Sequence, residues 1–183
     1  MVSHANSGHP GGSLSSIDYL SLLYSFIVSQ TGEKVVISNG HISPAVYSVL
    51  AELGYVDKKE SIRTFRQVDS IFEGHVSRHV PGVWYGTGPL GIGVSVAAGF
   101  AHAEKLKNSG QRVFAILGDG EAQEGQVYEM MHYAAKYKLS NFIVFMDYNE
   151  IQLSGPLNEV MPVDFHVTFE AAGWNVLKID GHD

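Results

Sequence analysis

The sequence contains no cysteine among its 183 residues. Disulfides, thiolate metal sites and a cysteine nucleophile are therefore excluded, and any metal has to be held by oxygen or imidazole ligands. No apolar run reaches the roughly 18 residues that a membrane-spanning helix needs. Twelve basic residues stand against nineteen acidic ones, and they form no long cluster of the kind that binds nucleic acid. We expect a cytoplasmic protein without nucleic-acid or membrane partners.

Short apolar runs alternate with helical patterns along the chain. Strands are predicted at residues 35–37, 113–117, 142–147 and 175–179. Helices are predicted from a cap at Ser13 through Ile27, and at residues 44–53, 58–65, 89–107, 124–138 and 163–172. Because helical crossovers join parallel strands, this alternation predicts an α/β fold with a doubly wound parallel sheet and helices on both faces.

Polar residues follow two of the predicted strands. Gly118-Asp119-Gly120 comes directly after one strand, and Asn149 follows the next. Parallel strands bring their carboxyl ends to one edge of the sheet, where glycines let the backbone approach a phosphate. A divalent cation held by Asp119 and Asn149 would offset repulsion between carboxylate and phosphate, and all-oxygen ligation suits Mg²⁺ or Ca²⁺. A plain turn with Asp119 as helix cap explains the tripeptide alone equally well, but not the paired Asn149.

Several segments, in the same order along the chain, resemble the signatures of the transketolase family. They are Ser7–Gly12, Ser38–His41, Phe65–Gln67, Gly74–His75, Thr87–Gly91, Gly118–Gly125, Tyr148–Asn149 and Asp180–Asp183. The resemblance covers the whole chain, and collinear matches are far more specific than any single motif. It implies that thiamine diphosphate is bound together with Mg²⁺ or Ca²⁺.

The resemblance also implies roles for individual residues. The implied metal ligands are the side chains of Asp119 and Asn149 and the carbonyl of Ile151. The implied cofactor-binding residues are His41, Gly88, Pro89, Leu90, Gly118, Asp119, Gly120, Glu121, Glu124 and Asn149. In this assignment the amides of Gly120 and Glu121 contact the diphosphate. Glu124 matches a carboxylate cluster at the family's subunit interface, although a first-turn glutamate favoured by the helix dipole is the alternative.

Four of the nine histidines fall on these segments. His9, His41, His75 and His182 match the family's active-site histidines, and imidazole suits proton transfer with sugar hydroxyls and carbonyls. His9, His182 and Arg66 are the implied substrate contacts, with the guanidinium placed for a sugar phosphate. A locally hydrogen-bonded turn histidine and an exposed, ion-paired arginine are the alternatives.

The activity implied by the resemblance is transfer of a two-carbon ketol unit from a ketose phosphate to an aldose. In the family, a glutamate of a pyrimidine-binding domain activates the cofactor, and the sequence contains no such domain. We expect residues 1–183 to form a single diphosphate-binding domain that acts on sugar phosphates with a pyrimidine-domain partner subunit, as a homodimer or heterotetramer. A related thiamine diphosphate enzyme with another substrate, a cofactor-binding module without activity and a subunit that has lost its ligand are the alternatives.

Overall fold

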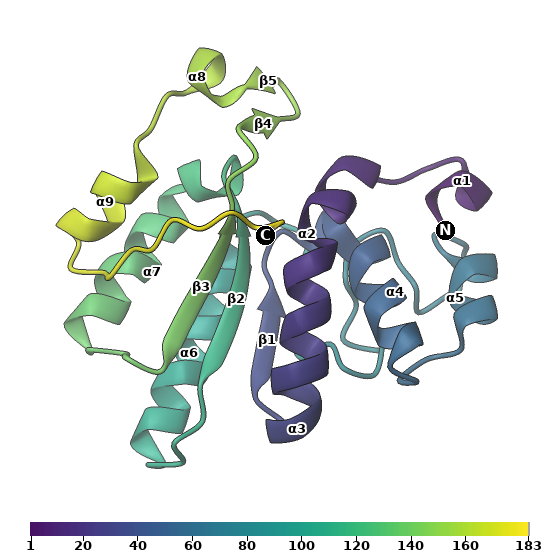
Figure 1. The fold of residues 1–183 in the computed structure, drawn as a ribbon, viewed down its shortest axis with the longest axis horizontal. Coiled ribbons are helices and arrows are strands. Elements are labelled where there is room, and N and C mark those ends of the chain that lie inside the picture. Colours follow the sequence, from purple (N-terminus) through teal and green to yellow (C-terminus); the bar gives the residue numbers. More distant parts are fainter. Residues whose placement is uncertain (183) are drawn as a thin grey trace.

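A parallel three-stranded sheet organises the computed structural model, which describes residues 1–182 (Figure 1). Strands β1 (Lys34–Ile37), β2 (Val113–Gly118) and β3 (Phe142–Asp147) lie side by side in that order. Val36 pairs with Ala115, and Ala115 with Val144. The three strands confirm the prediction made from their apolar runs. Asp183, the last residue of the final matching segment, lies outside the described residues.

Helical segments and one small hairpin account for the remaining regular structure. They are α1 (Val2–Ala5), α2 (Pro10–Leu22), the π-helical η1 (Leu23–Val28), α3 (Ser29–Thr31), the 3-10 turn η2 (Gly40–Ile42), α4 (Ser43–Glu52), α5 (Lys58–Thr64), α6 (Ile92–Leu106), the 3-10 turn η3 (Glu121–Gln123), α7 (Gly125–Lys136), β4 (Ile151–Gln152), β5 (Gly155–Pro156), α8 (Leu157–Val160) and α9 (Phe165–Ala171). Within residues 1–182, none of these helices has the length and apolar character needed to cross a bilayer.

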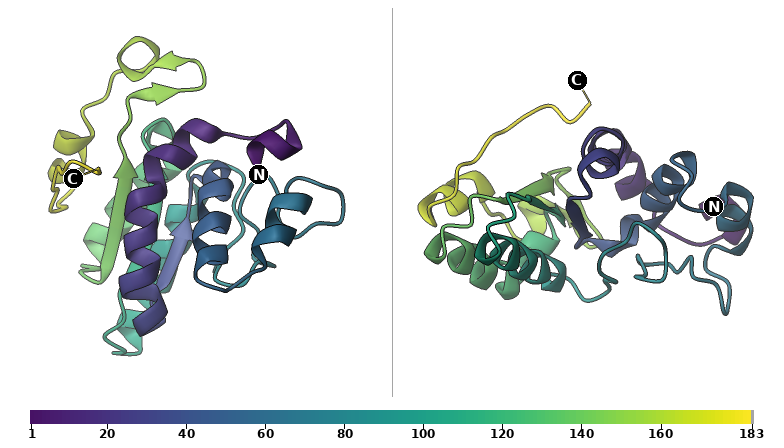
Figure 2. Two further views of the ribbon diagram at one scale, coloured as in Figure 1. Left: turned by 45° about the vertical axis from the view of Figure 1, so that its right-hand side comes forward. Right: turned by 90° about the horizontal axis from the view of Figure 1, so that it is seen from below.

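Alternate side chains of the strands point into two separate cores. Val35, Ile37 and Ile116 pack with α2, η1 and α4 on one face of the sheet. Val36 and Leu117 pack with α6, α7 and α9 on the other face. Figure 2 shows the helices on both sides of the strands. This arrangement confirms the predicted doubly wound α/β fold, in which parallel strands are buried on both faces.

Two helix starts differ from the prediction. The helix expected from Ser13 begins at Pro10, and the Ser13 hydroxyl donates to the carbonyl of His9 instead of capping. The helix expected from Pro89 begins at Ile92, because Gly91 adopts a φ of 79° that an α-helix cannot contain.

The strand predicted at residues 175–179 was wrong, because the segment does not pair with β3 in the described structure. Val176 packs against the core, but Leu177 and Ile179 are 78% and 72% exposed. The predicted alternation of helices and strands therefore does not extend to this segment, in which Leu177 and Ile179 stay exposed. A strand needs both a ladder partner and a buried face, and sequence pattern reports only the second requirement.

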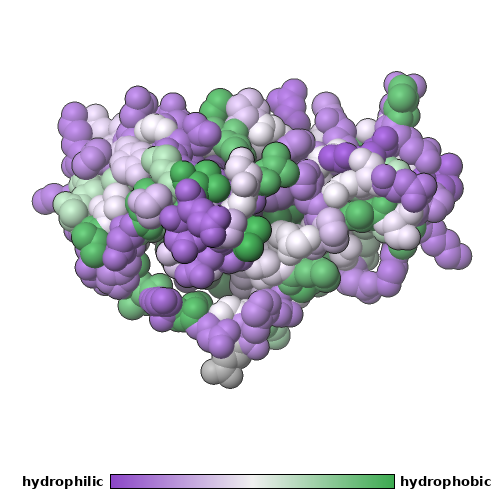
Figure 3. All heavy atoms as spheres, turned by 90° about the horizontal axis from the view of Figure 1, so that it is seen from above, coloured by the Kyte–Doolittle hydropathy of each residue, from purple (hydrophilic) through white to green (hydrophobic). Residues whose placement is uncertain are grey.

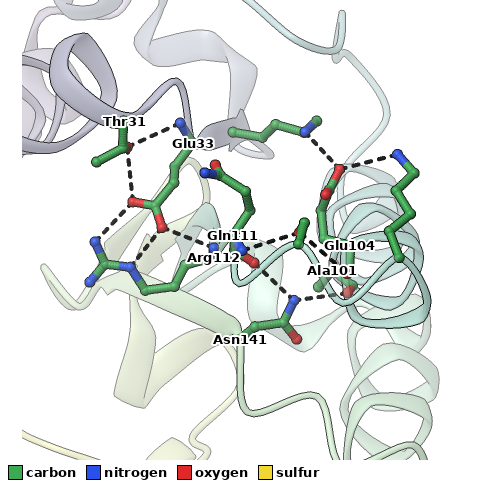
Figure 4. Close-up of polar contacts among 10 residues, drawn as sticks. Thr31, Glu33, Ala101, Glu104, Gln111, Arg112 and Asn141 are labelled. Atoms are coloured by element: carbon green, nitrogen blue, oxygen red, sulfur yellow. Dashed lines mark hydrogen bonds and ion pairs between the residues drawn. The ribbon is translucent and has the colours of Figure 1, made fainter.

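At the amino edge of the sheet, an ion pair between the buried Glu33 and the half-exposed Arg112 joins the start of β1 to the start of β2 (Figure 4). Glu33 is 4% exposed and accepts hydrogen bonds from the Arg112 backbone amide at 2.9 Å and from its guanidinium at 2.8 and 2.9 Å. Thr31 donates to the same carboxylate at 3.1 Å. The hydrogen bonds from Arg112 hold the pKa of Glu33 below its ordinary value of 4.5.

We predict that Glu33→Gln lowers the free energy of unfolding at pH 7 by about 1–2 kcal/mol, since the half-exposed arginine is partly screened by solvent. A carboxyl group whose pKa is depressed by folding stabilises the protein above its unfolded pKa. That contribution is lost as the pH falls through the folded value. Urea unfolding should therefore show the difference from wild type shrinking between pH 7 and pH 3. Glu60→Gln, in the exposed Glu60–Arg63 pair, is the control and should change stability little.

Candidate functional site

The turns after β2 and β3 bring Asp119 and Asn149 to the carboxyl edge of the sheet, as the sequence predicted. Asp119 is 2% exposed, and its backbone amide donates to the carbonyl of Asp147 at 3.3 Å. Its carboxylate accepts hydrogen bonds from the amides of Gly120 and Glu150, both at 2.6 Å. Burial raises the pKa of Asp119, and the negative charges of Asp147 and Glu150 raise it further. The two hydrogen bonds lower it but do not offset these effects. A cation beside this carboxylate would offset the unfavourable free energy of burying its negative charge.

The side chains of the predicted metal ligands Asp119 and Asn149 already accept hydrogen bonds from nearby backbone amides. The side-chain oxygen of Asn149 accepts from the amide of Ile151 at 3.0 Å, and its nitrogen donates to Asp147 at 3.3 Å. Carboxylate, amide and carbonyl oxygens each accept more than one bond, so this donor set remains suitable for a hard cation. Within residues 1–182, no group of three or more histidines and acidic residues is placed to hold a metal. A metal here therefore needs the amide and carbonyl oxygens.

Two buried polar atoms at this edge have no hydrogen-bond partner within residues 1–182. They are the side-chain oxygen of Asn39, at the end of β1, and the side-chain nitrogen of Gln152, in β4. A Cβ on Gly118 would lie 3.6 Å from the Cβ of Asn39, and a Cβ on Gly120 would lie 3.0 Å from that of Gln152. The unused donor of Gln152 suits a ligand that only accepts hydrogen bonds, such as a diphosphate, whereas the unused oxygen of Asn39 suits a donor or a cation.

Glu121 joins the segments that form this edge. Its buried carboxylate accepts hydrogen bonds from the Ser38 hydroxyl at 2.6 Å, the Gly91 amide at 2.8 Å and the Gly118 amide at 3.2 Å. The Ser38 hydroxyl also accepts from the amide of Val94 at 3.0 Å. Burial raises the pKa of Glu121, while these donors favour its ionised form. The ends of β1 and β2 and the start of α6 are therefore linked through one carboxylate.

This role of the Glu121 side chain was not predicted from the sequence, which assigned only its backbone amide to the cofactor. The sequence did contain a signal for this role. An acidic residue follows the glycine turn, and a serine ends a strand at the same edge of the sheet. The other glutamate of the segment, Glu124, is exposed and lies beside Gly91. A Cβ added to Gly91 would lie 3.0 Å from the Cβ of Glu124.

The predicted loop Gly88–Leu90 lies next to this carboxylate. Leu90 is 44% exposed at the surface of the carboxyl edge. Figure 3 views the edge from above, where apolar side chains reach the surface among hydrophilic ones. A hollow of about 280 Å³ lies elsewhere, between α5 and the loop that follows it, and no predicted site residue lines it.

Three of the four predicted histidines lie near one another: His9 before α2, His41 in η2 and His75 in the loop between α5 and α6. The rings of His9 and His41 lie 5.2 Å apart, edge to face. Burial lowers the pKa of His41, and the neighbouring His9 and His75 lower it further. Burial, Arg66 and His9 likewise lower the pKa of His75. Arg66 donates to the Ser7 hydroxyl at 2.5 Å, which places it at the same cluster.

His182 makes a contact that was not predicted from the sequence. Its Nδ1 lies 2.8 Å from a carboxylate oxygen of Asp18 on α2, and this hydrogen bond raises the pKa of His182. The pair spans 164 positions of sequence, so no local pattern could have indicated it. The structure therefore groups His9, His41 and His75, and places His182 with Asp18.

We predict that Glu121→Gln lowers the free energy of unfolding by about 1–3 kcal/mol, because the amide nitrogen replaces an acceptor and faces a donor. The Gly91 amide should then exchange its hydrogen faster. Denaturant unfolding and hydrogen exchange measure the two effects. Glu129→Gln, an exposed substitution on α7, should produce neither. Equal effects of both substitutions would contradict the role assigned to Glu121.

We predict that Asp18→Asn shifts the pKa of His182 down toward its ordinary value of 6.5. The change removes the carboxylate that favours the protonated ring. The pKa of His41, which burial lowers, should stay unchanged and is the internal control. Titration of the histidine ring protons by NMR measures both. An unchanged His182 pKa would show that the pair is not formed in solution.

Comparison with known proteins shows the family. Residues 1–183 match the family model for the transketolase thiamine diphosphate binding domain. The chain is 35% identical to one of the subunits of the apulose-4-phosphate transketolase of Phocaeicola vulgatus, over 100% of this chain and 68% of that subunit. It is 34% identical to the 6-deoxy-6-sulfo-D-fructose transketolase subunit SqwG of Clostridium sp. (strain MSTE9), over 96% of this chain and 67% of that subunit.

Solved structures give the same result. The transketolase from Leishmania mexicana superposes with a TM-score of 0.88 at 30% identity, over 97% of this chain and 29% of that chain. The transketolase from Campylobacter jejuni gives a TM-score of 0.83 at 34% identity, over 100% of this chain and 31% of that chain. The chain thus spans about two thirds of the subunit relatives and less than a third of these solved transketolases. It belongs to the transketolase family of transferases and carries that family's thiamine diphosphate-binding domain.

Proposed function

We propose that this chain is the thiamine diphosphate- and divalent-metal-binding part of a transketolase. With a pyrimidine-domain partner subunit, it transfers a two-carbon ketol unit from a ketose phosphate to an aldose acceptor. The observation that carries the proposal is the meeting of buried Asp119 with Asn149 at the carboxyl edge of the sheet, beside a glycine turn. Relatives that are named transketolase subunits support the need for a partner.

In this proposal the carboxyl edge holds the cofactor. The Asp119 and Asn149 side chains and the Ile151 carbonyl bind Mg²⁺ or Ca²⁺, while the backbone of the Gly118–Gly120 turn faces the diphosphate. The Gly88–Leu90 loop, positioned through Glu121, lies along the aminopyrimidine. Bound thiamine diphosphate supplies the electron sink for cleavage of a carbon–carbon bond.

The histidine cluster moves protons in the proposed reaction. Burial lowers the pKa values of His41 and His75 and so favours the neutral ring, which has one donor and one acceptor nitrogen. With His9 they can hold and release a proton at a sugar hydroxyl or carbonyl. His182 joins them only if it leaves Asp18.

Arg66 is the proposed contact for the anionic end of the substrate. Its guanidinium is exposed, lies beside the histidine cluster, and has geometry suited to a phosphate. The two subunit relatives are named for sugars that carry a terminal phosphate or sulfonate. A ketose with a terminal anionic group is therefore the donor class that we propose.

We predict that thiamine diphosphate binds the chain only in the presence of Mg²⁺, and that Asp119→Asn weakens this binding about 100-fold, since it removes the charged ligand of the cation. Calorimetric titration with Mg²⁺ and then with chelator measures both effects. Asp69→Asn, at an exposed aspartate of the α5 loop, is the matched control and should bind as wild type does.

Binding that is insensitive to chelator and to Asp119→Asn would contradict the proposed metal site. Absence of binding calls for the same titration with a transketolase pyrimidine domain present, since that domain completes the pocket. Absence of binding in both titrations would overturn the proposed function.

A further inference from the structure

The β4–β5 hairpin has an inverted pattern of side chains. Ile151 and Leu153 are 65% and 99% exposed, whereas Gln152 between them has its side-chain nitrogen buried. A strand with one solvated face normally turns its apolar residues inward and its polar residues outward. The hairpin lies above the carboxyl ends of β2 and β3 (Figure 1). The inward glutamine therefore faces the turn that carries Asp119.

Gln152 approaches this turn closely because residue 120 is glycine. A Cβ there would lie 3.0 Å from the Cβ of Gln152 and 3.4 Å from its side-chain oxygen, and carbon atoms pack best at about 3.5–4.0 Å. The backbone of Gly120 has ordinary helical dihedrals, so close approach accounts for the glycine better than conformation does. A side chain at residue 120 would separate Gln152 from the turn.

The Gln152 nitrogen is a hydrogen-bond donor without a partner. Such a buried donor is unfavourable unless an acceptor reaches it. The Asn141 oxygen, which also lacks a partner, is different, because that amide already donates to the carbonyls of Ala101 and Gln111 at the amino edge. At Gln152 the missing group is an acceptor. The side-chain oxygen, not Nε2, is the amide atom nearest to Gly120, so the amide has to rotate for Nε2 to face the turn.

We propose that Gln152 binds the diphosphate by donating a hydrogen bond from Nε2 to a phosphate oxygen. The inference rests on the proposed function and adds a residue to the site. Phosphate oxygens only accept hydrogen bonds, which matches the unused donor, and the terminal amide reaches them by turning about a soft torsion. The Gly118–Gly120 turn would then hold the diphosphate from below, and Gln152 would hold it from the hairpin.

The experiment compares Gln152→Leu, which keeps the size and removes the donor, with Gln152→Lys, which restores a donor. Thiamine diphosphate and inorganic diphosphate are titrated separately in the calorimeter with Mg²⁺, in the presence of a pyrimidine domain if wild type requires it. We expect Gln152→Leu to bind both about tenfold more weakly, and Gln152→Lys to recover most of that loss. Gln30→Leu, at an exposed glutamine of α3, should bind as wild type does.

A second readout separates binding from a structural role. Because Nε2 has no protein partner, Gln152→Leu should melt at no lower temperature than wild type without ligand. In wild type, the side-chain amide resonances of Gln152 should shift when inorganic diphosphate and Mg²⁺ are added. A lower melting temperature with unchanged dissociation constants would overturn the inference.

The outcomes also separate this inference from the proposed function. If wild type binds in a manner that depends on Asp119 and Gln152→Leu binds equally well, the inference alone is wrong. If wild type binds neither ligand, with or without the pyrimidine domain, both are wrong.

Discussion

The buried carboxylate of Glu121 is the interaction on which the carboxyl edge depends. It receives hydrogen bonds from the end of β1, the end of β2 and the residue that precedes α6. A buried charge is unfavourable unless its hydrogen-bonding capacity is used, and here three donors use it. The segments that supply those donors are consequently held in one arrangement. That arrangement places Gly118–Gly120, and therefore Asp119, opposite the hairpin that carries Gln152.

The two edges of the sheet differ in how their buried charges are compensated. At the amino edge, Glu33 is paired with Arg112, and its pKa is lowered. At the carboxyl edge, the pKa of Asp119 is raised, and Asp147 and Glu150 add to the negative potential. The buried carboxylate at the amino edge is thus compensated by a cationic side chain of the chain itself, whereas a cation would have to be added to compensate Asp119. This difference in electrostatics is why we place function at one edge only.

Much of this arrangement follows from local sequence. Apolar runs located β1, β2 and β3, and the parallel topology then required that residues after β2 and β3 meet, which brought Asp119 and Asn149 together. The failures involve contacts between distant residues. Ser38 and Glu121 are 83 positions apart, and His182 and Asp18 are 164 apart. The segment at residues 175–179 has the pattern of a strand, but pairing depends on the neighbouring backbone and cannot be read from its own residues.

We propose that the carboxyl edge of the sheet holds a metal-bound diphosphate. The most direct measurement replaces Mg²⁺ with paramagnetic Mn²⁺, which also prefers oxygen ligands, and records backbone amide signals in the presence of thiamine diphosphate. We expect selective broadening of the Gly120 and Glu150 amides, which donate to Asp119, while the Arg112 amide at the amino edge stays sharp. Broadening centred on the amino edge, or spread evenly over the surface, would contradict this proposal.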